Sequence, residues 1–537
     1  MSEGFEAEGA RGDLRFGTIP NVLALGAVEH GSRVALEEGD VRLTYAELDA
    51  RVVETARGFV AMGLAPGDRV GVWAPNSWRW AVTALGALAA GGVLVPINTR
   101  YKGPEAAYVL QKSRARALVV AEGFLGASYL SWLADAGVDL GALAIASIGD
   151  DPGPRGVTLE ALVARGERVD AAEIARRRRA LSPDDPCDLL FTSGTTGRPK
   201  GVVCTHAQSL RAFFDWAQIV GLRAGDRYLV VPPFFHTFGY KAGLLASLMT
   251  GATVLPHAAF DAGAVLARVA VDRVGVIPGP PALYQSLLAH PDLAATDRST
   301  LRLAVTGAAV IPVELVERMK RELGFETVLT AYGLTEATGV ATMCRRGDSA
   351  ETVATTSGRA IPGVEVRVVG DDGVEVPRGA PGELVVRGYT VTRGYFEDDA
   401  ATRDAVDAEG YLHTGDVAVM DEQGNIRITD RKKDMFIVGG FNAYPAEIEQ
   451  AIAKHPAVGD VAVVGMADER LGEVGAAFVV RRAGVDATEA EIIAFCRENM
   501  ANYQVPRRVC FVDALPRNAS GKVLKFELRA ALATRPT

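Results

Sequence analysis

A stretch rich in glycine and hydroxyl groups, FTSGTTGRPKG, occupies residues 191–201 and has the composition of a phosphate-binding loop. Glycines let backbone N–H groups turn toward an anion, and a lysine adds a point charge for terminal phosphates. The stretch is not the common GxxxxGK[ST] loop, and the VVCTH after it is typical of a strand rather than a helix. A polar hairpin loop is the alternative. The candidate phosphate ligands are Thr192, Ser193, Gly194, Thr195, Thr196, Gly197 and Lys200.

A second candidate site is TAYGLTEAT at residues 330–338. Tyr332 could stack on a base, and Thr335 could donate a hydrogen bond to a phosphate. Glu336 offers the hard carboxylate oxygens that magnesium prefers. The competing interpretation is an ordinary helix start capped by Thr335, and this segment alone favours that interpretation.

Two further motifs carry one candidate each. In YLHTGDVA, at residues 411–418, Asp416 could accept hydrogen bonds from two ribose hydroxyls, although most aspartates after a glycine lie in simple turns. In PRNASGKVLK, at residues 516–525, Lys522 follows a flexible Ser-Gly pair, although most such lysines are only solvated. His236 lies among aromatic residues in PPFFHTFGYKAG, where a lone histidine is more often part of the core than a catalyst.

The elements that would position these residues form an α/β pattern. Short apolar strands such as DRVGVWAP and ARALVVAE alternate with helical segments, which predicts parallel sheets with helices on both faces. From about residue 355 the pattern changes to alternating strands around a DDG turn, which predicts a β-rich subdomain. After the charged break DRKKD, at 430–434, about 100 residues contain their own strands and helices. We therefore expect a large N-terminal domain, 1–430, and a small α+β domain, 434–537.

Composition excludes several classes of protein. The 537-residue chain has a net charge of −9, which disfavours general nucleic-acid binding. The only dense basic cluster, residues 176–179, is expected on a solvated helix face. Five cysteines without a CxxC pair argue against a disulfide framework or a zinc site and fit a cytoplasmic protein. The uncharged run 80–97 is interrupted by Gly91, Gly92 and Pro96, so we expect a helix, a turn and a strand there and no integral membrane association. The sequence leaves a homodimer open.

Taken together, the motifs resemble those of the adenylate-forming superfamily of acyl-CoA synthetases, non-ribosomal peptide synthetase adenylation domains and firefly luciferase. TSGTTGRPKG, YGLTE, TGD, RKKD and the late GK occur in the family's order, and the resemblance covers residues 20–530. It implies a reaction in which a carboxylic acid and ATP form an acyl-adenylate and diphosphate, after which CoA displaces AMP. ATP, Mg²⁺ and CoA are the implied co-substrates and cofactor, and residues 431–433 the implied hinge of a mobile C-terminal domain.

The same resemblance implies roles for individual residues. Residues 192–200 would bind the β- and γ-phosphates of ATP, Thr335 the α-phosphate and Glu336 the magnesium ion. Lys522 would bridge the carboxylate and the α-phosphate during adenylation, and His236 would lie at an aromatic gate near the acyl group. The remaining implied residues are Gly307, Ala308, Ala309 and Tyr332 for adenine, Gly333 for cofactor binding, Asp416 and Arg431 for ribose, Lys433 for the hinge, and Gly439 and Gly440 for the pantetheine tunnel. Asp430 and Lys525 depart from the family's usual Gly and Arg.

The substrate inference depends on two segments. FFHTFGYKAG and IVGGFNAYPAEIE look most like actinobacterial CoA ligases of steroid-ring degradation, and related ligases in terpenoid pathways also take polycyclic acids. We therefore expect a bulky, apolar, polycyclic acid. Small residues at Gly279 and 307–309 fit a roomy pocket but fit a medium- or long-chain fatty acid equally well. An acyl-AMP ligase that loads a carrier protein is a further alternative, which the compact stretch 380–430 disfavours. A nucleotide-binding protein without turnover is the alternative from another class.

Overall fold

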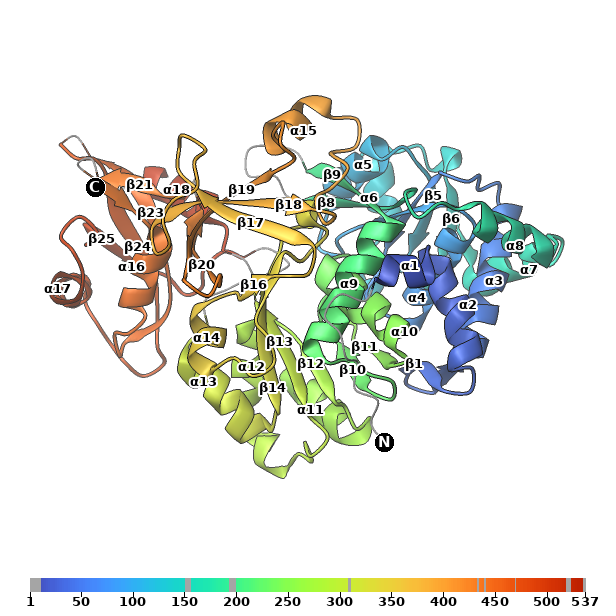
Figure 1. Cartoon of the computed structure of the whole chain (residues 1–537), viewed down its shortest axis with the longest axis horizontal. Helices are drawn as coiled ribbons and strands as arrows, with labels where there is room; N and C mark the ends of the chain where they lie inside the picture. The colour runs from blue at the N-terminus through green and yellow to red at the C-terminus, as the bar shows by residue number, and fades with distance from the viewer. Residues whose placement is uncertain are drawn as a thin grey trace.

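The computed structural model describes residues 11–149, 156–192, 199–307, 311–431, 434–438, 441–468, 470–517 and 523–534. Its strands form four sheets, and the chain runs from two large α/β layers through a small β sheet to a separate C-terminal unit (Figure 1). The α/β architecture expected from the sequence is confirmed. Within the described residues, no helix is both long and apolar enough to cross a membrane.

The first sheet has seven strands in the order β7-β6-β5-β3-β4-β8-β9. Its neighbours pair in parallel except β8 and β9, which are antiparallel. Val70 and Val72 of β3 pack into one buried cluster and Trp73 into another, so both faces of this sheet are covered. The strands are β3 Arg69–Trp73, β4 Val93–Pro96, β5 Ala115–Val120, β6 Ala144–Ser147, β7 Val157–Thr158, β8 Pro186–Thr192 and β9 Lys200–Thr205.

The second sheet has nine strands in the order β16-β15-β14-β13-β12-β10-β11-β1-β2. Its central strands are parallel, and antiparallel pairs close both edges. The strands are β1 Val34–Glu38, β2 Val41–Thr44, β10 Arg227–Val230, β11 Thr253–Pro256, β12 Val276–Pro278, β13 Leu303–Gly307, β14 Thr327–Tyr332, β15 Thr342–Met343 and β16 Arg359–Ala360. This sheet carries the motif around Glu336 just beyond the end of β14.

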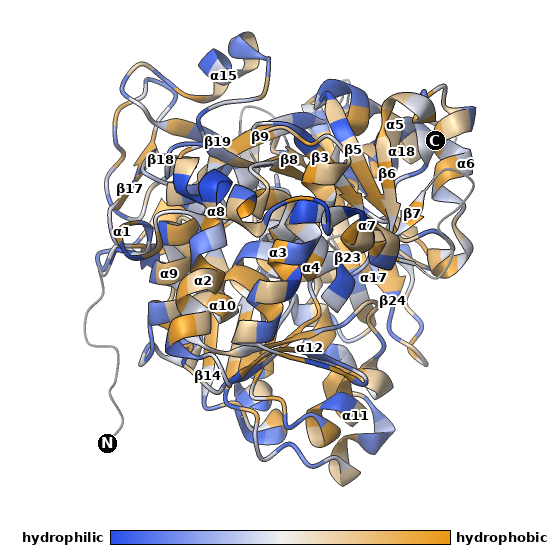
Figure 2. Ribbon diagram, turned by 90° about the vertical axis from the view of Figure 1, so that its right-hand side faces the viewer, coloured by the Kyte–Doolittle hydropathy of each residue, from blue (hydrophilic) through white to orange (hydrophobic). Residues whose placement is uncertain are grey.

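Helices cover the two sheets and fill the space between them. The apolar run 80–97 becomes α4, Trp78–Ala89, followed by β4, both almost completely buried, which confirms the expected helix, turn and strand. In Figure 2 the strands of the sheets are mostly apolar, and hydrophilic stretches lie on the helices outside them. The other helices are α1 Gly12–Phe16, α2 Ile19–Glu29, α3 Tyr45–Ala61, α5 Gly103–Lys112, α6 Tyr129–Asp135, α7 Leu159–Gly166, α8 Ala171–Ala180, α9 His206–Val220, α10 Ala246–Thr250, α11 Ala262–Val271, α12 Pro281–Leu288, α13 Val313–Arg318 and α14 Ala350–Thr355.

The sequence suggested that the basic run on α8 forms a solvated face, but two of its four arginines are largely buried. The side chain of Arg177 is only 15% exposed and pairs with Glu173, while it also donates to backbone carbonyls before β3 and after α4. The side chain of Arg178 is 11% exposed and pairs with Asp49 of α3 at 2.9 Å. The expectation holds for the exposed Arg176 and Arg179 and was wrong for Arg177 and Arg178, because α8 packs on α3 and α4, where local acids and carbonyl groups satisfy their guanidinium groups.

The β-rich subdomain is an antiparallel sheet in the order β17-β18-β19-β20, with β17 Val364–Val369, β18 Pro381–Gly388, β19 Leu412–Met420 and β20 Ile426–Arg431. Helix α15, Asp399–Ala405, lies between β18 and β19 in the chain. In the antiparallel ladder of β19 and β20, Asp416 lies opposite Arg431, the last residue of β20. The strand that leads into the expected hinge is therefore the partner of the strand that carries Asp416.

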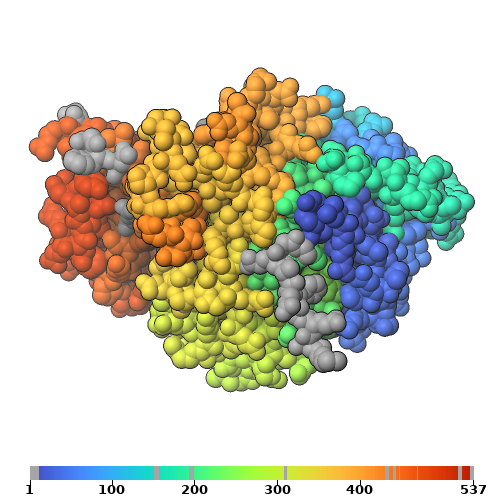
Figure 3. Space-filling model, viewed as in Figure 1, coloured from blue at the N-terminus to red at the C-terminus, as the bar shows by residue number. Residues whose placement is uncertain are grey.

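The C-terminal unit has its own sheet, β22-β21-β24-β23 with β25 beside β24, and its own buried clusters. In Figure 3 it forms one end of the molecule, and its helix α16 contacts β20. The exact boundary at 431–433 stays a prediction, because residues 432 and 433 lie outside the described residues. The elements are β21 Phe436–Val438, β22 Phe441–Ala443, α16 Pro445–Ile452, β23 Val458–Asp468, β24 Gly472–Arg481, α17 Glu489–Asn499, β25 Arg508–Phe511 and α18 Lys525–Thr534.

Candidate active site

The glycine-rich loop connects two paired strands, as its sequence indicated. Thr192 is the last residue of β8 and Lys200 the first of β9, and the two are directly opposite each other in the antiparallel ladder. The ladder therefore fixes both ends of the loop. Ser193, Gly194, Thr195, Thr196 and Gly197 lie outside the described residues, so their role as phosphate ligands stays a prediction.

Glu336 lies beside this loop and is held by two hydroxyl groups. The Thr192 hydroxyl donates to Oε1 of Glu336 at 3.3 Å, and the Tyr395 hydroxyl donates to the same oxygen at 3.0 Å. Through these two bonds, the end of β8 and the segment after β18 both contact the carboxylate of the YGLTE motif. A carboxylate oriented in this way beside a predicted phosphate-binding loop suits Mg²⁺, which proteins commonly hold through one or two carboxylates and the substrate's phosphates.

Sequence analysis missed Tyr395. Its backbone bridges to Val202 of β9, and its ring lies under the ammonium group of Lys200, with Nζ 4.8 Å from the ring centroid. Burial, the charge of Glu336 and the hydrogen bond to it all raise the pKa of Tyr395, so the phenol stays protonated as a donor. The only signal in the sequence is an aromatic residue after a glycine in RGYFEDD, which alone indicates no site.

The turn that carries Glu336 is the short 3-10 helix η6, Thr335–Ala337. Leu334 precedes it without a side-chain cap, so the interpretation of Thr335 as an N-cap is wrong. Gly333 has no room for a side chain, because a Cβ there would collide with the carbonyl oxygen of Gly339. The hydroxyl of Thr335 is therefore not used as a helix cap and is consistent with a phosphate ligand.

Tyr332 and Asp416 are joined directly. The Tyr332 hydroxyl donates to Oδ2 of Asp416 at 2.5 Å, although the two residues come from different sheets. Asp416 is 4% exposed and lies within strand β19, so it is not an ordinary turn aspartate. Gly415 before it has φ +68°, a conformation that strains other residues, and its N–H donates to Glu383. Arg431 lies opposite Asp416 in the ladder, which is all the structure describes of its placement.

Gly307 lies at the carboxyl end of β13, opposite Ala331 and thus one residue from Tyr332. A Cβ on Gly307 would lie 2.6 Å from the carbonyl oxygen of Ala331, so the close approach of the two strands requires glycine. Carboxyl ends of neighbouring parallel strands are the usual place for nucleotides in α/β sheets. Ala308 and Ala309 lie outside the described residues.

His236 is not the core histidine that its apolar surroundings suggested. Its side chain is exposed to solvent, and desolvation by the surrounding protein atoms lowers its pKa. Its Nδ1 accepts a hydrogen bond from the backbone N–H of Phe238 at 3.3 Å. The neutral ring therefore carries its proton on Nε2.

The turn before His236 is held by Asn76, another residue that sequence analysis missed. Asn76 is 3% exposed, and its side-chain amide donates to the carbonyl groups of Val230 and Pro232. Its carbonyl oxygen accepts from the N–H of Phe234 at 2.6 Å. The available signal was a polar residue that ends the apolar stretch VWAPN, because a buried asparagine needs such partners.

Lys433, Gly439, Gly440 and Lys522 lie outside the described residues, so the structure does not test the hinge, the pantetheine tunnel or the adenylation lysine. Lys525, which departs from the usual Arg, forms an ion pair with Glu449 of α16 at 2.9 Å. The lysine therefore still attaches the start of α18 to a neighbouring helix.

Comparison with protein families matches residues 24–396 to the AMP-binding enzymes and residues 447–522 to the C-terminal domain of the same enzymes. The chain belongs to the AMP-binding enzyme family. This membership confirms the expected adenylate-forming family, and, together with relatives named as CoA ligases, the AMP-forming acid–thiol ligase class. The use of ATP and CoA follows from that class.

Two similar curated proteins come from actinobacteria. The enzyme of Rhodococcus jostii is 48% identical over 516 residues, covering 95% of this chain and 98% of its own. The enzyme of Mycobacterium tuberculosis is 49% identical over 524 residues, covering 96% and 99%. Both are named 3-[(3aS,4S,7aS)-7a-methyl-1,5-dioxo-octahydro-1H-inden-4-yl]propanoyl:CoA ligase.

Solved structures of the family superpose over almost the whole AMP-binding enzyme. ATP-bound MatB from Rhodopseudomonas palustris is 30% identical with a TM-score of 0.84 and covers 96% of this chain and 99% of its own. The anthranilate CoA ligase AuaEII, in complex with anthranoyl-AMP, is 28% identical with a TM-score of 0.86 and covers 96% and 98%.

Proposed function

We propose that this AMP-binding enzyme joins CoA to a fused-ring carboxylic acid of steroid or terpenoid origin, with a propanoate side chain. The observation that carries the proposal is the identity of 48% and 49%, over nearly the full length, with two ligases whose names specify a fused-ring propanoate. A medium- or long-chain fatty acid is the second candidate, since a medium-chain acyl-CoA ligase of mouse mitochondria is 34% identical over 515 residues.

The proposed mechanism begins with attack of a carboxylate oxygen on the α-phosphorus of ATP, and the bond to diphosphate breaks. Thr192, the loop after it and Lys200 hold the departing phosphates, while Thr335 orients the α-phosphate. Glu336, aimed by Thr192 and Tyr395, would hold Mg²⁺, which neutralises phosphate charge. Lys522 supplies the positive charge between the acid and the α-phosphate.

Nucleotide positioning falls to the residues at the strand ends. Tyr332 stacks on adenine, and its hydroxyl keeps Asp416 oriented toward the ribose. In the second step the CoA thiol attacks the acyl carbonyl carbon and AMP leaves. A rotation at 431–433 would exchange Lys522 for the tunnel at Gly439 and Gly440, because two reactions in one site need two sets of groups.

Mass spectrometry of products tests the proposal. The enzyme is incubated with ATP, Mg²⁺ and CoA and with a mixture of palmitate, octanoate, benzoate and a fused-ring propanoate. A dominant fused-ring CoA thioester is the expected result. A dominant palmitoyl- or octanoyl-CoA would replace the proposed substrate with a fatty acid, and adenylate without thioester would replace CoA with a carrier protein.

A cytoplasmic location and a homodimer remain predictions that accompany this proposal. The five cysteines are free thiols, as expected of a protein in a reducing compartment. Light scattering after size-exclusion chromatography measures the number of chains.

A further inference from the structure

A completely buried ion pair joins strand β8 to the helix that follows His236. Nζ of Lys241 is 3.0 Å from Oδ2 and 3.2 Å from Oδ1 of Asp188, and both side chains are 0% exposed. Neither residue belongs to a motif that the proposed mechanism uses. A buried ion pair is weak evidence for stability, because desolvation of both charges offsets their attraction, so its presence calls for another explanation.

The pair has further polar neighbours. The thiol of Cys187 donates to Oδ2 of Asp188 at 3.1 Å and lies 3.5 Å from the Ser209 hydroxyl. Burial acts to lower the pKa of Lys241, but the charge of Asp188 and the two adjacent thiols raise it above its usual value overall. Lys241 therefore stays protonated at neutral pH and donates to the carboxylate of Asp188.

The elements that meet at this pair lead to three parts of the site. Lys241 lies in the π-helix η3, Phe238–Leu245, which begins two residues after His236. Asp188 lies on β8, which ends at Thr192, and opposite it in the ladder is Cys204 of β9. The thiol of Cys204 is 4.0 Å from the hydroxyl of Thr338, two residues after Glu336.

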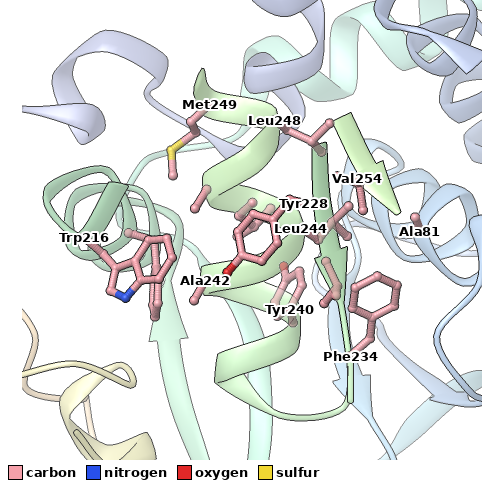
Figure 4. Packing of buried hydrophobic residues seen from close by; sticks show 14 of the residues in the cluster. Ala81, Trp216, Tyr228, Phe234, Tyr240, Ala242, Leu244, Leu248, Met249 and Val254 are labelled. Carbon is pink, nitrogen blue, oxygen red and sulfur yellow. The ribbon is translucent and has the colours of Figure 1, made fainter. Parts of the chain in front are cut away.

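The segment around Lys241 has an unusual conformation that its packing maintains. π-helical turns are rare and occur frequently at functional sites. Figure 4 shows Tyr240 pointing from this helix into the aromatic core, where its ring centroid is 5.9 Å from that of Trp80. Gly243 allows the helix to approach Val230, whose side chain would lie 2.6 Å from a Cβ at that position.

We propose that Lys241 and Asp188 are positioning residues that hold the turn at His236, which is predicted to lie near the acyl group, in register with Thr192 at the start of the predicted nucleotide loop. The pair fixes the π-helix to the strand that ends at Thr192, so that the carboxylate and the α-phosphate meet in line. This inference rests on the proposed adenylation function. The pair touches neither substrate and acts through the segments it joins.

The test replaces both charges with apolar groups. The variant Lys241→Met/Asp188→Leu keeps the site filled without leaving one charge unpaired, and such exchanges are often neutral for stability. We expect kcat of acid-dependent ATP–diphosphate exchange to fall by about tenfold to a hundredfold, because small misplacements of reacting groups have such effects. The melting temperature should stay near that of the parent. The milder pair Lys241→Gln/Asp188→Asn, which keeps a hydrogen bond, should recover part of the rate.

A matched control is the ion pair between Arg302 and Asp226. These residues lie just before β13 and β10, at the amino ends of the strands, whereas the site lies at the carboxyl ends. Arg302→Met/Asp226→Leu should leave kcat unchanged whatever it does to the melting temperature. Unchanged kcat and KM in Lys241→Met/Asp188→Leu would overturn the positioning role, as would a rate loss that only follows a fall in melting temperature. Absence of exchange in the parent protein with every acid would instead reject the proposed function.

Discussion

The hydroxyl of Tyr395 donates to the carboxylate of Glu336 across 59 residues of sequence. The face of the same tyrosine ring forms a cation–π contact with the ammonium group of Lys200. One side chain thus orients the proposed metal ligand and the lysine of the nucleotide loop, from a segment that contains no known motif.

Tyr395→Phe removes the hydroxyl and keeps the ring. Glu336 then loses one of the two donors to Oε1, and a hydrogen bond to a charged group contributes about 1.5–3 kcal/mol. We expect the Mg²⁺ concentration for half-maximal adenylation to rise about tenfold, and the affinity for Mg-ATP, measured calorimetrically, to fall. Tyr389→Phe is the matched control, because it removes a similar bond to Asp215 at a distance from Glu336. Equal Mg²⁺ dependence in the parent and Tyr395→Phe would refute the orienting role.

Asp416→Asn tests the ribose assignment. The buried carboxylate accepts from Tyr332, and we predict that it also accepts from ribose hydroxyls. We expect KM for ATP to rise by about tenfold or more, since bonds to a charged acceptor are lost. The parent should discriminate against 2′-deoxy-ATP, and the variant should discriminate less. Tyr332→Phe keeps the carboxylate and should show a smaller effect, and a variant that still rejects 2′-deoxy-ATP would argue for another ribose ligand.

Lys522→Ala separates the two half-reactions. The family resemblance predicts that Lys522 contacts the carboxylate and the α-phosphate, so its loss should lower the rate of adenylate formation by at least about a hundredfold. Thioester formation from added acyl-adenylate and CoA should continue at a rate close to that of the parent. Lys525→Ala is the nearby control, because this lysine pairs with Glu449. An unchanged adenylation rate in Lys522→Ala would exclude the proposed mechanism.

Asp215 should make stability depend on pH. Burial raises its pKa to about 6, despite the hydrogen bond from Tyr389 and the charge of Arg211, while Asp13 adds to the rise and Arg11 opposes it. Between pH 4 and pH 6 the native state binds a proton that the unfolded chain does not bind. The contribution of Asp215 to stability therefore falls as pH rises through this window, by up to about 3 kcal/mol.

The variant Asp215→Asn removes this titration. Its melting temperature relative to the parent should increase from pH 4.5 to about pH 6.5 and level off above that. Thermal unfolding followed by circular dichroism at matched ionic strength measures the difference. A difference that is constant over this range would show that Asp215 titrates at its ordinary pKa in the native state.

The sequence predicts the fold well where its signals are local. The alternation of strands and helices, the run 80–97 and the strand on each side of the glycine-rich loop can be identified without the structure, because each depends on neighbouring residues. The family resemblance also indicated Glu336 and Asp416. The alternative interpretation of Asp416 as an ordinary turn residue was wrong. Gly415, with its positive φ, lets strand β19 continue through Asp416 to Met420.

Residues whose role depends on distant partners could not be predicted. Tyr395 and Asn76 contact site segments through groups far away in sequence, and nothing near them indicates those partners. The complete burial of Lys241 contradicts the usual behaviour of lysine and follows only from the opposing Asp188. The same reasoning explains Arg177 and Arg178, whose burial depends on the packing of α8.

All five cysteines are free and at most 6% exposed, and burial raises the pKa of Cys204, Cys344 and Cys496 to about 11. Thiolate is the reactive form, so the native enzyme should be almost inert toward aromatic disulfide reagents. The thiol of CoA can then be titrated directly in the reaction mixture with little background from the enzyme. Unfolding would release the protein's own thiols to the same reagent, so a single colour reaction reports substrate consumption in the native state and loss of the fold in denaturant.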